Sequence, residues 1–386
     1  MNYLILTDCF YPQSKSASRH IYDLAEELVR RKNNVCIVCP GYNKISVNKK
    51  LNKKIKILRE KKFNNKNKNY FIRGFQEILL PFKFYKLICN NIKTVDKLIV
   101  YSPSIFFGLI LKKIKKKYNC KVILLLRDVF PEWAAQINIL KKNSFIFFFL
   151  KYISNLQFKF SDTICLQSKK DYNLINKFYK IPNKKKKILY NWITIKKIKY
   201  KRDNLKKYFK IVFGGTVGPA QNWGNIIFLI KKTILLNKKI IFFIVGDGME
   251  KNKILKTLNN INSNKILFLN SMKEDDYLSF IKNCDLGILS LNKNILFDNF
   301  PGKFFSYMEA NLPILSDLPD EHQLAKLIKK YKIGLNSDPD NKEKFFINLK
   351  KIYSTSVRKK LLKENYNKIH KNFFSTIKAC DIIEEI

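Results

Sequence analysis

The stretch Ile211–Leu236, IVFGGTVGPAQNWGNIIFLIKKTILL, has the pattern of a buried strand, a glycine-rich turn and an amphipathic helix. Short β-branched apolar runs that alternate with longer amphipathic segments are typical of a parallel sheet covered by helices. The same alternation starts at Tyr3–Thr7 and His20–Arg31, and it resumes here through Lys239–Val245 and Leu286–Leu289. The stretch therefore marks the beginning of a second domain of the same class as the first.

The chain has 386 residues, which is enough for two such domains. We predict an α/β fold of two doubly wound, Rossmann-like domains that face a central cleft, at residues 1–195 and 208–360. A C-terminal helix at 361–386 is expected to pack back toward the first domain, and the hinge is expected within 193–210. The basic run Lys49–Tyr70 has few apolar residues and is expected to be a surface loop. Ligands bind beyond the carboxyl ends of the strands in such sheets, so the loops there are candidate sites.

The charge balance is strongly basic, with 75 Lys+Arg against 30 Asp+Glu and a formal net charge of +45. Most of the basic residues are lysines in a chain rich in Asn and Ile, which indicates that part of the charge is drift in an AT-rich genome. The remainder is expected to attract phosphates of nucleic acid, anionic lipid or a phosphorylated substrate. An apolar fraction of 46% excludes wholesale disorder.

The positions of the cysteines and the sequence of the N-terminus indicate in which cellular compartment the protein is expected. The eight cysteines lie mostly in or beside apolar runs, as buried thiols do in a reducing compartment. The opening MNYLILTDCF lacks a basic region and a cleavage site, so it is predicted to be a strand and not a signal peptide. The three histidines are too scattered in sequence to suggest a metal cluster. We expect a cytoplasmic protein, or one peripheral to the inner face of the cytoplasmic membrane.

Two glycine-rich loops follow strands of the second domain. Backbone amides in such loops can bind an anion at the start of the following helix. A tight turn that requires positive φ at glycine explains the same pattern equally well. The candidate donor-binding residues in these loops are Gly215, Thr216, Gly218, Gln221, Gly246 and Gly248.

The block Asn299–Ser316, NFPGKFFSYMEANLPILS, is the sharper signal. Lys303 follows a Pro-Gly turn at a predicted helix start, where a lysine and backbone amides can bind a diphosphate. Glu309 lies six residues further on, about 9 Å along a helix, which suits hydrogen bonds to ribose hydroxyls. A solvated lysine and a surface glutamate are the alternative interpretations.

This block resembles the donor region of the GT-B glycosyltransferases of family 4 (group 1), a subgroup of which carries P-x-K-x-x-[ED]-Y-[ML]-A-x-G-x-P-[IV]. The positions that match in register are Pro301, Lys303, Tyr307, Met308, Pro313 and Ile314. The acid that usually holds the ribose falls on Ser306, with Glu309 the nearest acid on the same helix face, and its usual partner acid falls on Asp298. The resemblance implies a donor site formed by Asp298, Pro301, Gly302, Phe304, Ser306 and Glu309.

The first domain shows the same resemblance. LTDCFYPQSKSASRHIYDLAEELVRRKNNVCIVCP is similar to the family's opening, with Ser16 and Ala17 where glycines usually lie near the donor phosphates. Arg19, beside His20 near the first helix start, is a candidate phosphate contact, and a solvated pair is the alternative. LLRDVFPEWAAQINIL, which contains Asp128, resembles the R-D-x-[FW]-P-[ED] loop of bacterial sugar transferases that assemble amino-sugar polysaccharides. LYNWI resembles the family's N-W-[IV] ending of the first domain.

The resemblance implies a retaining transferase without metal or other cofactor. It would move a sugar from a UDP-linked nucleotide diphosphate donor to a lipid-linked saccharide. The likeness of the Asp128 loop implies that this sugar is an amino or deoxy-amino sugar. The pathway implied is surface polysaccharide biosynthesis, as of O-antigen, lipopolysaccharide or capsule. Lys303 and Asp128 are the implied catalytic residues. Lys303 would neutralise the leaving diphosphate, and Asp128 would orient the acceptor hydroxyl or stabilise charge on the sugar. A helix cap or a bridge to Arg127 is the alternative for Asp128.

An anionic membrane surface is a further expected partner. The lysines of the run 49–62 supply charge, and Tyr70–Cys89 has apolar residues at helical spacing. Packing of that helix on its own sheet explains the stripe as well.

Two other functions stay open: a GT-B-shaped nucleotide-sugar epimerase, which would turn over without an acceptor, and a basic nucleic-acid-binding protein. The second is disfavoured because the aromatic residues fall in apolar periodic runs and not among basic stripes.

Overall fold

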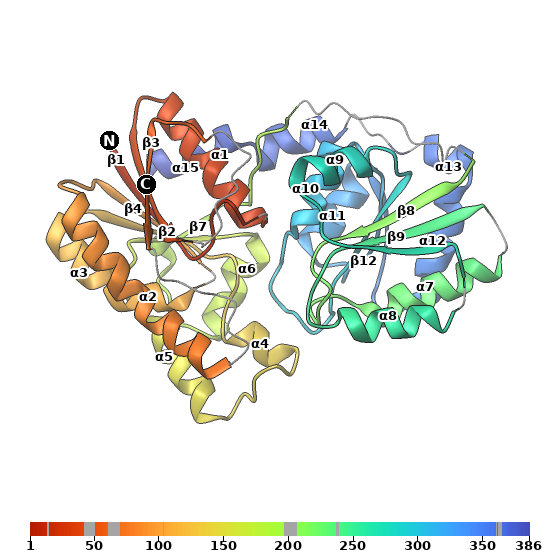
Figure 1. Cartoon of the computed structure of the whole chain (residues 1–386), viewed down its shortest axis with the longest axis horizontal. Coiled ribbons are helices and arrows are strands. Elements are labelled where there is room, and N and C mark those ends of the chain that lie inside the picture. The colour runs from red at the N-terminus through yellow and green to blue at the C-terminus, as the bar shows by residue number, and fades with distance from the viewer. Residues whose placement is uncertain are drawn as a thin grey trace. The chain divides into compact units, whose positions relative to one another are not determined.

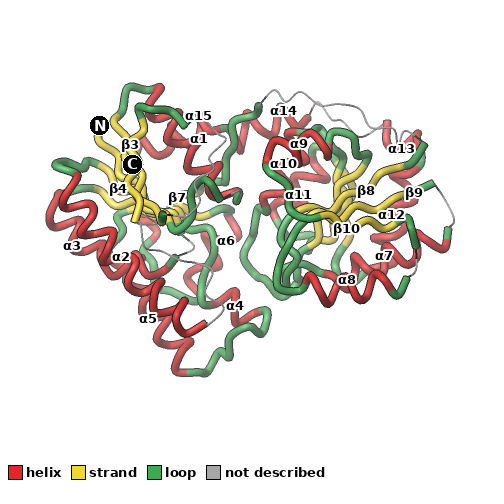
Figure 2. The backbone as a smooth tube through the Cα atoms, in the orientation of Figure 1, coloured by secondary structure: helices red, strands yellow, loops and turns green. Residues whose placement is uncertain are grey.

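The computed structural model describes the chain except residues 14, 42–50, 61–69, 103, 197–206, 237–238, 262, 360 and 362–364, and for 70–75, 355 and 359 it describes the backbone only. The chain forms two compact units: unit 1 is Met1–Thr194 with Phe373–Ile386, and unit 2 is Ile195–Asn372. In Figures 1 and 2 each unit has one parallel sheet with helices on both of its faces. The predicted α/β class with two doubly wound sheets is confirmed. The predicted hinge lies mostly outside the described residues.

Unit 1 is built on a parallel sheet with the described strand order β3-β2-β1-β4-β5-β6-β7. The order reverses between β1 and β4, which is the position where open α/β sheets bind ligands. The strands are β1 (Asn2–Thr7), β2 (Asn34–Pro40), β3 (Ile55–Glu60), β4 (Lys97–Tyr101), β5 (Lys121–Leu125), β6 (Thr163–Leu166) and β7 (Lys186–Ile188).

The strand β3 corrects one prediction. It lies inside Lys49–Tyr70, which was expected to be a loop, and it pairs with β2 in register from Val35–Ile55 to Pro40–Glu60. Of its six residues only Ile55 is fully buried. An edge strand needs few apolar residues because one side faces solvent, so the sequence pattern was too weak to show it.

The helices of unit 1 cover both faces of this sheet. They are α1 (Ser16–Arg30), α2 (Tyr70–Asn91), α3 (Gly108–Tyr118), α4 (Glu132–Gln136), α5 (Phe145–Phe160), α6 (Lys169–Leu174) and α15 (Thr376–Glu385). On the described part of α2, Leu80, Pro81, Phe84 and Ile88 are buried, and Phe84 stacks on Phe107. Its described part therefore packs on the unit's own core, although Phe82 of the predicted apolar stripe is exposed.

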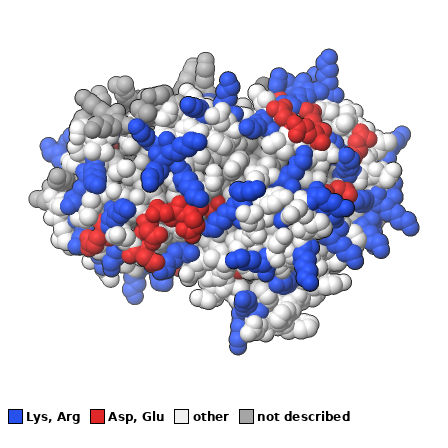
Figure 3. Space-filling model, turned by 180° about the vertical axis from the view of Figure 1, so that it is seen from behind, with Lys and Arg blue, Asp and Glu red and all other residues white. Residues whose placement is uncertain are grey.

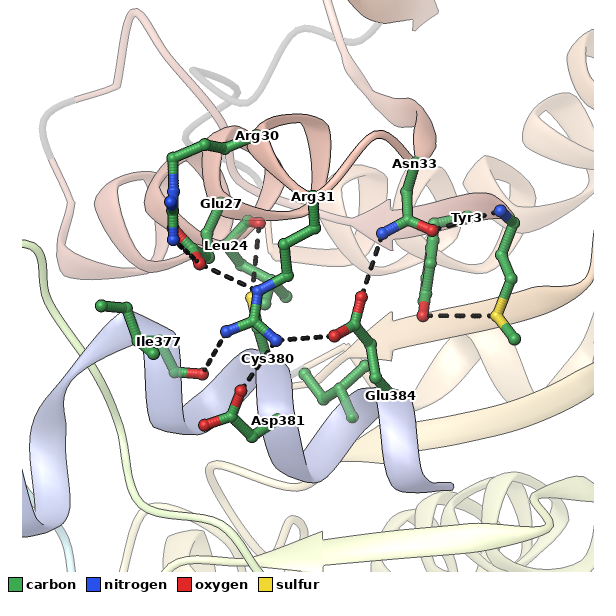
Figure 4. A network of polar contacts seen from close by, with 12 residues as sticks. Tyr3, Leu24, Glu27, Arg30, Arg31, Asn33, Ile377, Cys380, Asp381 and Glu384 are labelled. Carbon is green, nitrogen blue, oxygen red and sulfur yellow. Dashed lines mark hydrogen bonds and ion pairs between the residues drawn. The ribbon is translucent and has the colours of Figure 1, made fainter.

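The last helix returns to unit 1 and packs against α1 (Figure 4). Arg31, just after α1, contacts Asp381 at 2.7 Å and Glu384 at 2.6 Å. The same guanidinium donates to Glu27 at 2.9 Å, and Cys380 is buried in the core between the two helices. Residues 361–372 of the predicted C-terminal helix belong to unit 2, so the chain rejoins unit 1 at Phe373.

Unit 2 repeats the plan with the described strand order β10-β9-β8-β11-β12-β13 and a reversal between β8 and β11. Its strands are β8 (Phe209–Gly214), β9 (Ile240–Val245), β10 (Ile266–Leu269), β11 (Leu286–Ser290), β12 (Ile314–Asp317) and β13 (Gly334–Ser337). Its helices are α7 (Trp223–Leu235), α8 (Lys251–Asn259), α9 (Glu274–Ile281), α10 (Gly302–Glu309), α11 (Gln323–Lys330), α12 (Lys342–Tyr353), α13 (Thr355–Lys359) and α14 (Asn365–Ile369). Of the helices in the described parts of both units, none has the length and apolarity needed to cross a bilayer.

Candidate functional site

The carboxyl ends of β8, β11 and β12 bring several predicted residues of unit 2 together. The glycine loop after β8 and the start of α10 meet beside the strand-order reversal. Tyr307 holds α10 there, because its hydroxyl lies 3.1 Å from the carbonyl oxygens of both Val212 in β8 and Ile288 in β11. The helix α10 is thus attached near its end to the two strands that flank the reversal, where a ligand site is expected.

Lys303 lies in the first turn of α10 and is buried, with 7% of its surface exposed. Its Nζ donates to Oε1 of Gln221 at 2.7 Å and lies 3.6 Å from the ring centroid of Phe213. Burial holds the pKa of this ammonium well below its usual range, and the nearby Asp317 acts in the opposite direction. The solvated lysine that was the alternative interpretation is therefore wrong. Gln221, also predicted for the donor site, is therefore in direct contact with Lys303.

Asp317, at the end of β12, is a member of the site that the sequence analysis missed. It is fully buried, and its Oδ2 accepts hydrogen bonds from Nδ2 of Asn225 at 2.9 Å and of Asn222 at 3.3 Å. Burial raises the pKa of this carboxyl to about 7. The available signal was an acid directly after an apolar strand run, ILSD, at the carboxyl edge.

The two glycine loops of unit 2 interlock. A Cβ on Gly246 would lie 1.9 Å from the carbonyl oxygen of Gly215, and one on Gly248 would lie 2.2 Å from that of Val217. These two glycines are therefore required for the close approach of the loops. Gly215 is different, because it is exposed, has φ +113° and would direct a Cβ toward Cε of Lys303 at 3.6 Å. Thr216 is exposed beside it, and Gly218 is buried.

One backbone amide predicted to bind the donor at the start of α10 already has a hydrogen-bond partner within the protein. The amide of Phe304 donates to the carbonyl oxygen of Pro301 at 2.9 Å, and its side chain is fully buried against Phe300. Phe304 is therefore a packing residue, and its amide is already engaged in the first turn. Gly302 and Ser306 are half-buried, and Oγ of Ser306 donates to the carbonyl oxygen of Gly302 at 3.4 Å.

The two carboxylates predicted for the donor site are both buried. Oε1 of Glu309 accepts a hydrogen bond from the amide of Lys196 at 2.8 Å, so the surface-residue interpretation of Glu309 is wrong. Asp298 is 1% exposed, with Oδ1 3.7 Å from Nδ1 of His322. Both carboxylates thus have positions fixed by partners within unit 2.

Asp128 of unit 1 follows β5 and is half-buried. Burial raises the pKa of its carboxyl to about 6, with Arg127 acting in the opposite direction. The guanidinium of Arg127 lies over the rings of Trp192 (4.9 Å) and Tyr101 (5.6 Å), and Nη1 donates to the carbonyl oxygen of Leu189 at 3.0 Å. Arg127 is therefore held by aromatic rings and a backbone carbonyl.

A polar cluster surrounds Asp128 at the carboxyl edge of the unit 1 sheet. Among the described residues it contains buried side-chain atoms without a hydrogen-bond partner: Oδ1 of Asp8, Oγ of Ser102, Nε and Nη2 of Arg127, and Oε1 of Gln167. These residues follow β1, β4, β5 and β6, which are neighbours in the sheet. Burial also raises the pKa of Asp8 to about 6. Buried polar atoms without partners are costly, so this edge is suited to a polar ligand.

The residues predicted on α1 have different environments. Ser16 is exposed in the first turn, and Ala17 is half-buried against the core. Arg19 is 6% exposed and donates from Nη2 to the carbonyl oxygen of Thr194 at 2.7 Å, so it is not the solvated residue of the alternative interpretation. His20 is also buried, its Nδ1 lies 3.0 Å from the hydroxyl of Tyr101, and burial and Arg127 hold its pKa well below the usual range.

Two doubly wound parallel-sheet units of this kind define the GT-B fold, which the similar solved structures share. Residues 17–197 match the model of Glycosyltransferase Family 4, and residues 195–372 match that of Glycosyl transferases group 1. The chain belongs to the group 1 glycosyltransferases of this fold.

Individual relatives agree with this assignment. The chain is 22% identical over 292 residues to the probable glycosyltransferase WbjE of Pseudomonas aeruginosa, covering 72% of each chain. The crystal structure of Anabaena HepE in complex with UDP-glucose is similar with a TM-score of 0.71 at 13% identity, covering 100% of this chain and 98% of that one. WaaG, a glycosyltransferase involved in lipopolysaccharide biosynthesis, has a TM-score of 0.70 at 14% identity and 99% coverage of both chains.

Proposed function

We propose that the protein is a retaining glycosyltransferase that moves a sugar from a UDP-linked donor to a lipid-linked saccharide in surface polysaccharide biosynthesis. The observation that carries the donor half is Lys303, buried at the start of α10 with its Nζ 2.7 Å from Gln221. A buried ammonium whose pKa is depressed by desolvation gains most from an anion that binds next to it. A diphosphate at the positive end of α10 is such an anion.

The donor contacts follow from the surroundings of Lys303. The exposed backbone of Gly215 and Thr216 and the start of α10 at Pro301 and Gly302 lie around the lysine and would contact the phosphates. In the reaction, the sugar–phosphate bond breaks and negative charge grows on the leaving diphosphate. A cation already positioned there stabilises that charge without reorganisation. Lys303 therefore has the catalytic role on the donor side.

The nucleoside end is assigned to the rest of α10. Ser306 is half-buried one turn after Gly302, and Glu309 lies a turn further with one carboxylate oxygen bonded to the Lys196 amide. A hydroxyl and a carboxylate on one helix face suit the two ribose hydroxyls. The choice of UDP is supported by HepE, which is described in complex with UDP-glucose.

The acceptor half is assigned to the polar cluster of unit 1. Asp128 would accept a hydrogen bond from the attacking hydroxyl or stabilise positive charge on the sugar, and Asp8 would act beside it. Their carboxyls have pKa values of about 6, so both are largely ionised near neutral pH. The sequence LLRDVFPEWAAQINIL is the support for an amino or deoxy-amino sugar. WaaG, which is involved in lipopolysaccharide biosynthesis, supports a surface-saccharide acceptor.

A lipid-linked acceptor requires contact with a membrane, which we place at the inner face of the cytoplasmic membrane. The net charge of +45 favours an anionic surface. Of the lysines in the predicted contact run, Lys53 and Lys54 are exposed, whereas Lys49, Lys50, Lys61 and Lys62 lie outside the described residues. Charge-driven binding of this kind weakens as salt shortens the Debye length, about 10 Å at 0.1 M.

The deciding experiment is titration calorimetry with UDP, GDP, ADP and dTDP. UDP should bind most tightly, Lys303→Ala should weaken binding, and Lys326→Ala, an exposed lysine on α11, should leave it unchanged. Equal binding of all four nucleotides by the parent and Lys303→Ala would refute the donor site. With UDP-sugars and an acceptor, NMR of the product anomer tests retention, and turnover without any acceptor would indicate the epimerase alternative.

A further inference from the structure

The first half of α5 has two apolar faces, and only one of them is packed. The buried side chains Phe147, Ile153 and Phe158 face the protein, where α5 packs against α3 and against Ile105 and Phe106. The opposite side has large exposed aromatic residues, which form what we call the α5 face. Its members, with exposed fractions, are Phe145 (85%), Phe148 (58%), Phe149 (41%) and Tyr152 (63%), and Ile146 (57%) is also exposed in the first turn.

Helical geometry explains why these residues form one surface. Phe145, Phe148, Phe149 and Tyr152 have the spacing i, i+3, i+4, i+7, which places them along one side of a helix. Single exposed apolar residues are ordinary on protein surfaces, whereas a continuous group of aromatic ones marks an interaction site. The packing of unit 1 does not require them, because its core contacts come from the other side of α5.

The charge around the α5 face indicates which partner it suits. The segment Trp133–Phe160 contains no acidic residue, and Lys141 and Lys142 are exposed directly before α5. Lys159 is exposed near the end of the helix, and the neighbouring α3 ends in Lys115, Lys116 and Lys117. In Figure 3 the lobe at the lower edge, where Figure 1 places α4 and α5, is mostly white with scattered blue and no red. Apolar aromatic side chains bordered by lysines match the acyl boundary and the phosphates of an anionic bilayer.

We propose that the α5 face inserts into the interfacial region of an anionic bilayer, with Lys141 and Lys142 at the lipid phosphates. This rests on the proposed function, which places the acceptor on a lipid, and it adds apolar insertion at a defined helix to the binding by charge. These side chains suit this depth, because the phenylalanine rings can leave water at the acyl boundary while the hydroxyl of Tyr152 stays near the headgroups. At 16 residues α5 is too short to span the bilayer, so it would lie in the surface.

The test compares vesicle binding of two matched double variants. Phe145→Ser with Phe148→Ser removes two exposed aromatic side chains of the α5 face, and Leu235→Ser with Met249→Ser removes side chains that are 81% and 71% exposed in unit 2. With vesicles of phosphatidylcholine and phosphatidylglycerol, the first pair should lower the partition coefficient by at least about tenfold, since each exposed aromatic contributes buried apolar area. The second pair should bind like the parent. Equal binding by all three proteins, or equal losses in both pairs, would overturn the proposal.

A second variant reports insertion directly. In Phe148→Trp, tryptophan fluorescence should shift to the blue on vesicle binding and be quenched by brominated acyl chains. Protein that remains bound at high salt should show the same blue shift and the same quenching. An unquenched tryptophan on bound protein would overturn the proposal. Sedimentation of the parent and the Phe145→Ser, Phe148→Ser variant tests the other occupant: if the parent is a dimer and the variant a monomer, the α5 face joins two copies and the proposal is wrong.

The outcome is separable from that of the proposed function. UDP titration of the Phe145→Ser, Phe148→Ser variant should give the parent's affinity, and turnover with a water-soluble acceptor analogue should be unchanged. Loss of vesicle binding with normal UDP binding supports the α5 face. Failure of the parent to bind UDP would refute the UDP-linked donor of the proposed function whatever the vesicles show.

Discussion

The carboxyl edge of the unit 2 sheet and that of the unit 1 sheet share one strand topology and differ in the side chains at their centres. In unit 2 the central group is one buried cation, Lys303, beside interlocked glycine loops and a helix start. In unit 1 it is a pair of carboxyls, Asp8 and Asp128, near buried polar atoms that have no hydrogen-bond partner among the described residues. Under the proposed function, the first edge would bind an anion mainly through backbone and one charge, and the second would bind hydroxyls through side chains. The same fold can thus hold both halves of a transfer reaction.

The largest expected effect on turnover is that of replacing Lys303. Lys303→Ala should lower kcat by a factor on the order of 10²–10³, as loss of one preorganised charge-stabilising group does. Steady-state kinetics with the preferred nucleotide sugar measure this, with Lys326→Ala as the control. Because Lys303 is buried against Phe213, thermal melting must show that the variant is folded. Normal turnover would mean that the diphosphate is neutralised elsewhere, and the contrast between the two edges would fail.

The next effect is at the carboxyl edge. Asp128→Asn should lower kcat on the order of 10², in the range of general acid–base residues. Its carboxyl has a pKa of about 6 and is required as the anion, so the parent's activity should fall as pH drops through about 6. Asp8, whose carboxyl also has a pKa of about 6, should make the fall of activity at acidic pH steeper. A pH profile of kcat/KM tests this, and the matched change Asp275→Asn on an exposed turn of α9 should keep the parent's profile.

A smaller effect distinguishes the two ribose candidates. Glu309→Ala should raise KM by roughly tenfold with less change in kcat, since a contact to the nucleoside acts in the ground and transition states alike. It should also lower the melting temperature, because it removes the acceptor of the Lys196 amide. Ser306→Ala should weaken UDP binding without a loss of stability. If only Ser306→Ala changes UDP affinity, Glu309 is a structural residue.

Stability at Asp317 should depend on pH in a defined direction. Burial raises the pKa of its carboxyl in the folded state to about 7, above the roughly 3.9 of the unfolded chain. The folded state therefore binds a proton more tightly, and this stabilisation is present below about pH 4 and lost as pH rises through about 7. Urea unfolding of Asp317→Asn between pH 4 and 8 should show a flatter profile than the parent. A parallel profile would mean that Asp317 is not the titrating group.

The smallest signal is proton uptake on binding. The pKa of Lys303 is depressed in the free protein, and a diphosphate beside the ammonium should raise it, so UDP binding should take up a fraction of a proton at alkaline pH. Calorimetry in buffers of different ionisation enthalpy measures this. The uptake should disappear in Lys303→Met and persist in Asp128→Asn. If proton uptake disappears in Asp128→Asn and persists in Lys303→Met, the donor and acceptor assignments of the two sheet edges would be reversed.

Much of the fold was predictable because strand and helix periodicities are local. The alternation after Ile211 and the apolar run Ile240–Val245 indicated parallel strands that the structure contains. The edge strand β3 was missed because its burial comes from one neighbour and not from its own composition. For the candidate site, the sequence predicted Lys303 from a helix start, Gln221 from the loop after a strand, and Asp128 from the resemblance of its loop to a family motif. Asp8, which follows β1, and Asp317, which ends β12, were not predicted.

The sequence by itself determined the class of fold, the order of its elements and the placement of polar residues at strand ends, since these depend on patterns a few residues long. Only the tertiary structure decided which of those residues are buried and what each one contacts. It engages the Phe304 amide within its helix, bonds Glu309 to Lys196 and places Lys303 over Phe213. It also leaves the aromatic residues of α5 exposed. The reason is physical: desolvation and packing depend on neighbours that are distant in sequence, and the sequence pattern cannot specify those contacts.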